Sequence, residues 1–165
     1  MKTIKLIAAC ALLISAGGTF GHENSPHASH RAAVVKEQKA WGIAGDAPAA
    51  TRTITVRMTD DMRFAPRHIE VREGETVRLR AENRGQVLHE IVIGTPDALE
   101  QHAEMMQKHP GMEHDEPYMA HVPPGQRGEI VWQFNRPGTF RFGCLVAGHY
   151  QAGMSGTLTV HPRKP

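Results

Sequence analysis

Short segments that alternate apolar and polar residues, separated by turn signals, fill the chain from Thr51 onward. Such a segment is typical of a strand that buries one face, because successive side chains on a strand point to opposite sides. Prolines and glycines at residues 123–125 and 137–138 mark turns. The pattern predicts that residues 51–165 form an all-β domain, a sandwich or a barrel. The predicted strands are residues 53–58, 67–72, 75–81, 87–93, 129–134, 139–142 and 156–160.

One stretch of different character, residues 95–109, is predicted to form a short helix. Thr95 can cap the first turn, and Pro96 fits the first helical position. The spacing of three apolar residues places them on one helical face. We expect this helix to be a flap inserted between strands, followed by an irregular stretch over residues 112–124. The apolar face consists of Leu99, Ala103 and Met106.

The start of the chain lies outside the strand pattern. Residues 1–21 combine two lysines, an apolar run and small residues, which is typical of a secretory signal peptide and too short for a membrane anchor. Cleavage is predicted after Gly21, with Gly18 as the alternative. Residues 22–50 show no sustained period and are predicted to be a flexible arm that contains histidines. Within it, Trp41 is expected to dock on the domain.

The charge balance argues against a nucleic-acid partner. The chain has 19 Lys and Arg against 17 Asp and Glu, but residues 1–21 contain two lysines and no acid, which leaves 17 of each after cleavage. This balance does not favour phosphate binding. The sequence also contains no second long apolar run that would insert into a membrane. We therefore expect a periplasmic protein that is exported by its signal peptide.

A single cysteine remains once the predicted signal peptide is removed, because Cys10 lies within it. Cys144 can then be a reactive thiol, a bridge to another chain or a metal ligand. Metal binding also accounts for its neighbours, since Cys144, His149 and Met154 follow the spacing C-x4-H-x4-M. Soft sulfur ligands select copper, and two histidines and a cysteine with a weak axial methionine form the type 1 copper geometry. His89 is the candidate for the second histidine.

Other interpretations of these residues explain less. Cys144 as an inert buried thiol and Met154 as a core residue would leave their common spacing unexplained. A dinuclear copper centre would need two cysteines in this loop, and a multicopper oxidase would need H-x-H pairs, neither of which the sequence contains. Zinc remains an alternative metal, although methionine is not among its usual ligands.

The chain resembles the cupredoxins, the family of plastocyanin and azurin. This resemblance implies a Greek-key β-sandwich with copper at one end. Carried over residue by residue, it implies that His89, Cys144 and His149 form the equatorial plane of a type 1 copper site and that Met154 is the axial ligand. The matching segments are Met62–Pro66, Ile69–Val71, Gly74–Val77, Asn83–Gly85, His89 and the loop from Cys144 to Met154.

One subgroup of the family is more similar still. Trp41–Asp46, His89–Thr95 and Pro110–Pro117 resemble segments of the periplasmic cupredoxins associated with bacterial copper tolerance. Glu90 departs from the azurins, in which an amide side chain commonly follows the first histidine ligand. The tuning of the azurin site is therefore not transferred to this chain.

Two further groups of residues are candidates for additional copper ions, because histidine and methionine are ligands of Cu(II) and Cu(I). The first group lies in and after the predicted helix, where solvated histidines and core methionines are the alternative interpretation. The second lies in the predicted arm, where cleavage after Gly21 would make His22 the N-terminus. The first group is His102, Met105, His109, Met112, His114, Met119 and His121, and the second is His22, His27 and His30.

Three functions are consistent with these patterns. The first is a copper-binding protein that acts in copper tolerance and cycles between Cu(I) and Cu(II). The second is an electron carrier that docks on a redox partner, such as a cytochrome or an oxidase. The third is an enzyme, such as a cuprous oxidase, which would need an open or second copper centre; we expect no catalytic residues. A carrier would dock through an apolar surface, for which the candidates are Leu145, Val146, Ala147, Ala152 and the Pro123–Pro124 turn.

Overall fold

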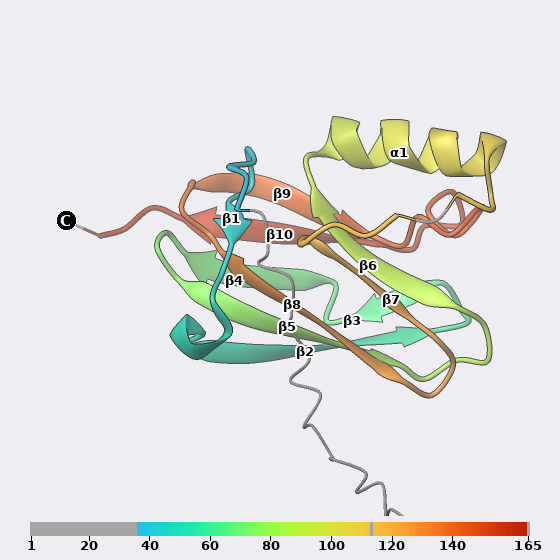
Figure 1. Cartoon of the computed structure of the whole chain (residues 1–165), viewed down its shortest axis with the longest axis horizontal. Helices are drawn as coiled ribbons and strands as arrows, with labels where there is room; N and C mark the ends of the chain where they lie inside the picture. The colour runs from blue at the N-terminus through green and yellow to red at the C-terminus, as the bar shows by residue number, and fades with distance from the viewer. Residues whose placement is uncertain (1–35, 113, 165) are drawn as a thin grey trace, which may run out of the picture. The chain divides into compact units, whose positions relative to one another are not determined.

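The chain folds into two five-stranded β-sheets packed face to face, with one helix against the outer face of the second sheet (Figure 1). The computed structural model describes residues 36–112 and 114–164. The signal peptide predicted for residues 1–21, and residues 22–35 with His22, His27 and His30, lie outside the described residues. The all-β Greek-key sandwich with a short flap helix is confirmed.

The first sheet has the strand order β1-β8-β5-β2-β3. Its pairs are antiparallel except for β2 and β5, which are parallel because the chain crosses to the other sheet between them. The strands are β1 (Ile43–Ala44), β2 (Arg52–Thr59), β3 (Arg63–Ala65), β5 (Thr76–Asn83) and β8 (Arg127–Gln133).

The second sheet has the strand order β4-β10-β9-β6-β7, in which β4 and β10 form the parallel pair. Strand β6 lies between β9 and β7, and β9 ends at Gly143, which pairs with Val92 of β6, so the loop from β9 to β10 begins there. The strands are β4 (His68–Arg72), β6 (His89–Gly94), β7 (Met119–Val122), β9 (Gly138–Gly143) and β10 (Ser155–His161).

Strand β6 is buried along its whole length because it has a covered surface on each side. Ile91 and Ile93 point into the core between the sheets, whereas Val92 packs in a second cluster beneath the helix. By the same alternation, His89 lies on the face of Ile91 and Glu90 on the face of Val92. The alternation of side chains along β6 therefore places two buried polar residues, His89 and Glu90, on opposite faces of the strand.

The predicted helix is confirmed as α1 (Pro96–Lys108). The Thr95 hydroxyl accepts a hydrogen bond from the Ala98 N–H, which satisfies one of the free donors at the helix start. The predicted apolar face is also confirmed, since Leu99, Ala103 and Met106 are the buried residues of α1. Within the described part of the chain, no helix has the length and apolar character needed to cross a membrane.

Three strands were not recognised in the sequence, namely β1, β3 and β7. Strand β7 lies inside the stretch predicted to be irregular. It was not recognised because its four residues are too few to display an alternating pattern. Strand β1 lies inside the predicted arm, and its two residues pair with the edge of β8. Trp41 is buried as expected, and its carbonyl accepts a hydrogen bond from the indole N–H of Trp132. Ile43 and Ala44 of the predicted arm therefore pair with the first sheet.

Candidate metal centre

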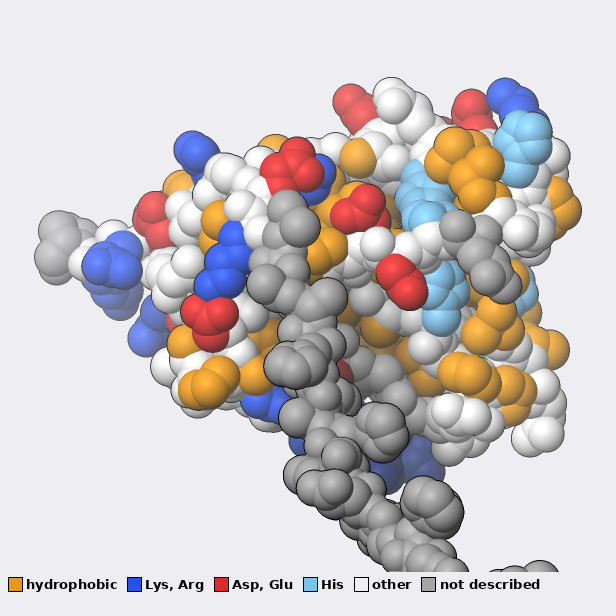
Figure 2. Space-filling model, viewed as in Figure 1, with side chains coloured by type: hydrophobic (Ala, Val, Ile, Leu, Met, Phe, Trp, Pro, Cys, Tyr) orange, Lys and Arg blue, Asp and Glu red, His pale blue; other side chains and the backbone are white. Residues whose placement is uncertain are grey.

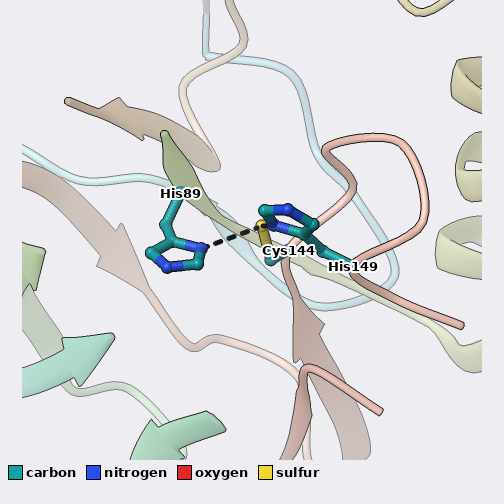
Figure 3. A group of neighbouring side chains, drawn as sticks. All are labelled: His89, Cys144 and His149. Atoms are coloured by element: carbon teal, nitrogen blue, oxygen red, sulfur yellow. Dashed lines mark hydrogen bonds between the residues drawn. The ribbon is translucent and has the colours of Figure 1, made fainter. Parts of the chain in front are cut away.

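Three side chains from different parts of the chain meet at one end of the sandwich (Figure 3). His89 begins β6, Cys144 directly follows β9, and His149 lies in the loop between β9 and β10. The Cys144 Sγ atom lies 3.3 Å from Nδ1 of His149 and 4.0 Å from Nδ1 of His89. Cys144 and His89 are fully buried, and His149 is half-buried. Among the described residues, only this group places three potential ligand atoms within 4.8 Å of one another.

The distances fit a metal ion held in a trigonal plane. Metal–nitrogen and metal–sulfur bonds of about 2.0 and 2.3 Å at trigonal angles place sulfur and nitrogen ~3.7 Å apart. The observed values of 3.3 and 4.0 Å lie on either side of this length. One thiolate and two imidazoles are the equatorial donor set of type 1 copper. The residues therefore fit copper by both geometry and chemistry.

The loop that carries Cys144 and His149 is held by its own backbone hydrogen bonds. The N–H of Cys144 donates to the carbonyl of Met154, and the N–H of Met154 donates to the carbonyl of His149. These bonds join the three residues of the C-x4-H-x4-M pattern in one closed loop. Met154 is fully buried. Gly143 keeps the loop close, because a Cβ atom there would lie 2.8 Å from the Tyr150 ring.

Burial keeps the thiol of the metal-free cluster protonated. Removal from water is the largest effect on Cys144 and raises its pKa to about 12, because an apolar environment disfavours the charged thiolate. The backbone N–H of Glu90 donates to Sγ at 3.4 Å, which favours the thiolate and partly offsets that effect. A metal ion therefore has to displace a tightly held proton when it binds.

Asp60 orients His89 and was not identified from the sequence. Its Oδ1 atom lies 3.0 Å from Nε2 of His89, so that nitrogen carries the proton and Nδ1 keeps a lone pair facing Cys144. The N–H of Gln86 donates to Oδ2 at 2.7 Å and is the main reason that the pKa of Asp60 is lowered. No sequence signal links Asp60 to His89, since the turn after β2 meets the start of β6 only in the fold.

An Asp60→Asn variant is expected to bind copper about 10- to 100-fold more weakly at this cluster. The asparagine oxygen can still accept from Gln86, but its amide then donates to Nε2 of His89. That contact favours the tautomer with the proton on Nδ1, the atom that faces Cys144. Competitive titration with a chelator of known affinity measures the change. Asp61→Asn is the matched control, and equal affinities of the two variants would contradict the orienting role of Asp60.

Glu90 connects the cluster to the other face of β6. Its carboxylate is buried and accepts from the N–H of Leu145 through Oε1 at 2.7 Å. The second oxygen lies 2.9 Å from Nε2 of His121 on β7. Burial raises the pKa of Glu90, whereas the charge of His121 opposes this rise. The departure from the azurin pattern at this position is thus a buried carboxylate that contacts both the cysteine loop and a histidine.

The histidines predicted for an additional copper ion form a second cluster beside α1. The rings of His102 and His114 have centroids 4.5 Å apart, and those of His114 and His121 are 6.2 Å apart. Nδ1 of His121 lies 3.6 Å from Asp115. Burial, followed by the charges of the other two histidines, lowers the pKa of His102. On the face shown in Figure 2, histidine side chains gather among hydrophobic ones in this region.

Three of the other four residues of that predicted group lie apart from this cluster. His109 caps the end of α1 and is exposed, and Met105 is exposed on the helix. Met119 is buried in the apolar cluster beneath α1. Met112 is exposed and lines an open groove next to His114 and His121. The structure therefore groups three of the seven residues and places one more at the edge of the group.

The apolar surface predicted around the cysteine loop is formed only in part. Leu145 is buried under α1 and does not contribute, which corrects the prediction. Val146 is half-buried, and Ala147 and Ala152 are exposed together with the Pro123–Pro124 turn. Val87 and Leu88, which immediately precede His89, are also exposed although they were assigned to a strand. Three of these residues, Leu88, Val146 and Ala147, line one open groove.

The fold and the cluster define a cupredoxin. The chain belongs to the family of copper-binding proteins that includes plastocyanin and azurin, whose family model matches residues 50–161. Copper is the cofactor of this family, and the cupredoxin relatives of this chain are tied to copper resistance.

Two curated relatives match nearly the whole chain. A copper-resistant cuproprotein CopI from Rubrivivax gelatinosus is 44% identical over 161 residues, which cover 97% of this chain and 96% of the relative. A protein of the same name from Pseudomonas aeruginosa is 36% identical and covers 92% of this chain and 96% of its own length. Among solved structures, auracyanin B superposes with a TM-score of 0.61 at 25% identity, covering 73% of this chain and 95% of the other.

Proposed function

We propose that this chain is an exported, periplasmic type 1 copper protein that acts in copper tolerance and cycles between Cu(I) and Cu(II). His89, Cys144, His149 and Met154 would hold the copper ion, with one thiolate, two imidazoles and one thioether as donors. The observation that carries this proposal is the convergence of Sγ and two imidazole nitrogens in a buried cluster. The names of the two CopI relatives, which match over nearly their whole lengths, support the role in tolerance.

Met154 is assigned by its place in the ligand loop. It is buried, and its backbone is hydrogen-bonded to both Cys144 and His149. A thioether at this place suits a weak axial bond, which tunes the reduction potential of type 1 copper. Tyr150, another residue of this loop, is not assigned as a ligand, because its ring lies against Gly143 and the apolar cluster beneath α1.

Copper bound at this cluster supplies a one-electron couple. The protein contributes three things to that couple: it fixes the orientation of His89 through Asp60, it excludes water from Cys144, and it directs the Glu90 N–H at the sulfur. A rigid ligand set that changes little between oxidation states lowers the cost of electron transfer. Hydrogen bonds to the cysteine sulfur tune the potential further. No catalytic step is part of the proposal.

Growth of a deletion strain in copper tests the role in tolerance. The strain is complemented with the parent gene, with Cys144→Ala, or with Val146→Ala as a control in the same loop. We expect the parent and the control to restore growth and Cys144→Ala to fail at equal protein level in the periplasmic fraction. Full tolerance with Cys144→Ala would show that the type 1 cluster is not the agent, and a cytoplasmic parent protein would contradict export.

An electron carrier is the second candidate function. It is favoured by the exposed apolar residues Val87, Leu88 and Ala147, each of which lies within two positions of His89 or His149 in the sequence. A redox partner such as a cytochrome or an oxidase would dock there and exchange electrons through the half-buried His149. Rapid electron exchange with a purified periplasmic cytochrome, lost in Leu88→Asp, would favour this function over tolerance.

A further inference from the structure

We propose that His102, His114 and His121, together with the carboxylate of Glu90, form a second binding site for divalent copper between α1 and β7. The site goes beyond the proposed function, because none of these residues belongs to the His89–Cys144–His149 cluster. The ligands come from four places in the fold: α1 supplies His102, the segment after it supplies His114, β6 supplies Glu90 and β7 supplies His121.

Free ring nitrogens are the first observation behind this site. Nε2 of His102 and both ring nitrogens of His114 are buried and make no hydrogen bond within the described part of the chain. Buried polar atoms without a partner are costly, and native proteins rarely keep them without a role. Three such atoms on two adjacent rings are therefore not accounted for by packing alone. A metal ion would use these nitrogens as ligands.

Charge is the second observation. Two carboxylates flank His121, since Glu90 lies 2.9 Å from Nε2 and Asp115 lies 3.6 Å from Nδ1. Imidazoles that face a buried carboxylate match a divalent cation, because the carboxylate offsets the ion's charge and either binds it or orients the ligand histidine. Among the described residues, no arginine or lysine contacts the buried carboxyl group of Glu90.

The groove beside the three histidines indicates how an ion reaches the site and which metal the site fits. An open groove of about 730 Å³ reaches the cluster and is lined by His114, His121, Met106 and Met112. Imidazole ligands suit both copper and zinc, and divalent copper binds such sites most tightly among the first-row divalent metals. The thioethers in the groove add donors that suit Cu(I) and not zinc. The site therefore fits copper better than zinc.

The ring nitrogens do not yet converge as they do in the first cluster, where the ligand atoms lie within 4.8 Å of one another. The ring centroids of His102 and His114 are 4.5 Å apart and those of His114 and His121 are 6.2 Å apart, so convergence on one ion requires the His114 ring to turn. The described residues between α1 and β7 carry no helix or strand. Binding of the ion is expected to fix the orientation of the His114 ring.

Glu90 also joins the two metal clusters. One carboxylate oxygen contacts His121, the other accepts from the N–H of Leu145, and the Glu90 N–H donates to Sγ of Cys144. An ion that draws on Glu90 or His121 alters the hydrogen bonds around the cysteine loop. Such bonds tune a copper–thiolate centre. Filling of the second site is therefore expected to shift the visible spectrum of the first, an effect that rests on the proposed function.

Copper titration of the full exported chain, beginning at His22, tests the site. Bound copper is counted by elemental analysis, and EPR spectroscopy separates tetragonal Cu(II) with nitrogen and oxygen ligands from the type 1 signal. The variants are His102→Asn with His114→Asn, and His114→Asn alone in case the double variant does not fold. His109→Asn with His161→Asn is the matched control, since both histidines are exposed and outside the cluster.

We expect the double variant to lose one Cu(II) of the tetragonal kind per chain, and the single variant to bind that ion at least about tenfold more weakly. The control keeps it. The same ion is expected in a Cys144→Ser background, so its presence does not depend on the type 1 centre. Unchanged stoichiometry and affinity in a folded His114→Asn variant would overturn the proposal. So would loss of the ion only when His22, His27 and His30 are replaced.

Discussion

A Cys144→Ser variant is expected to lose the intense visible absorption of the copper form while it keeps the fold. Serine has nearly the size of cysteine, but its hydroxyl is neither a soft donor nor ionised at neutral pH. The thiolate is the source of the charge-transfer band and the strongest ligand of the set. Copper affinity at this cluster should therefore fall by more than the roughly 10- to 100-fold that loss of an outer hydrogen-bond partner costs.

Visible spectra recorded during Cu(II) addition, with circular dichroism of the apo-proteins, measure this result. Val146→Ala is the control, because it changes the same loop without touching the proposed ligands. A visible band of parental intensity in Cys144→Ser would show that the band arises from other residues. Loss of the band in Val146→Ala as well would show that loop packing, and not the thiolate, determines it.

The second large effect concerns the thiol in the metal-free protein. The pKa of Cys144 is raised from 9.0 to about 12, so its thiolate fraction at neutral pH is about a thousandfold lower than in an unfolded chain. Alkylation by iodoacetamide is expected to be slower by at least this factor in the folded apo-protein. Its rate should rise about tenfold per pH unit beyond pH 9, where the rate of the denatured protein levels off.

The measurement uses the chain that begins at His22, in which Cys144 is the single cysteine, and follows the adduct by mass spectrometry. The shift also has a consequence for stability. Below pH 9 both folded and unfolded thiols are protonated, and above it the unfolded thiol ionises first, so the stability of the apo-protein falls as the pH rises. Equal alkylation rates for folded and denatured protein would contradict the burial of the thiol.

The sequence contained enough to predict the layers of the fold. Strands β2, β5, β8 and β10 each alternate over five or more residues, so their buried faces were readable. The cap and the apolar stripe of α1 were also explicit in the sequence. Strands β1 and β3 are two and three residues long, and segments of that length carry no period. Their pairing is set by the neighbouring strands.

The candidate ligands were predictable because three of them share one loop with a fixed spacing. The residues that orient these ligands were not predictable, since their positions depend on contacts across the fold. Asp60 meets His89 over 29 positions, and Glu90 meets Leu145 over 55. Glu90 stood out only as a departure from the azurins, and its contact with His121 needed the pairing of β6 and β7. Metal-site tuning thus depends on tertiary contacts that local patterns do not record.

The most direct test of the type 1 assignment is a titration of the folded protein, with its thiol reduced, with Cu(II) under visible and EPR spectroscopy. We predict an intense thiolate-to-copper band that saturates at one copper ion per chain, accompanied by a type 1 EPR signal. Further copper beyond that point should add no comparable band. The absence of such a band in the folded, reduced protein would contradict the assignment of His89, Cys144, His149 and Met154 as a type 1 copper site.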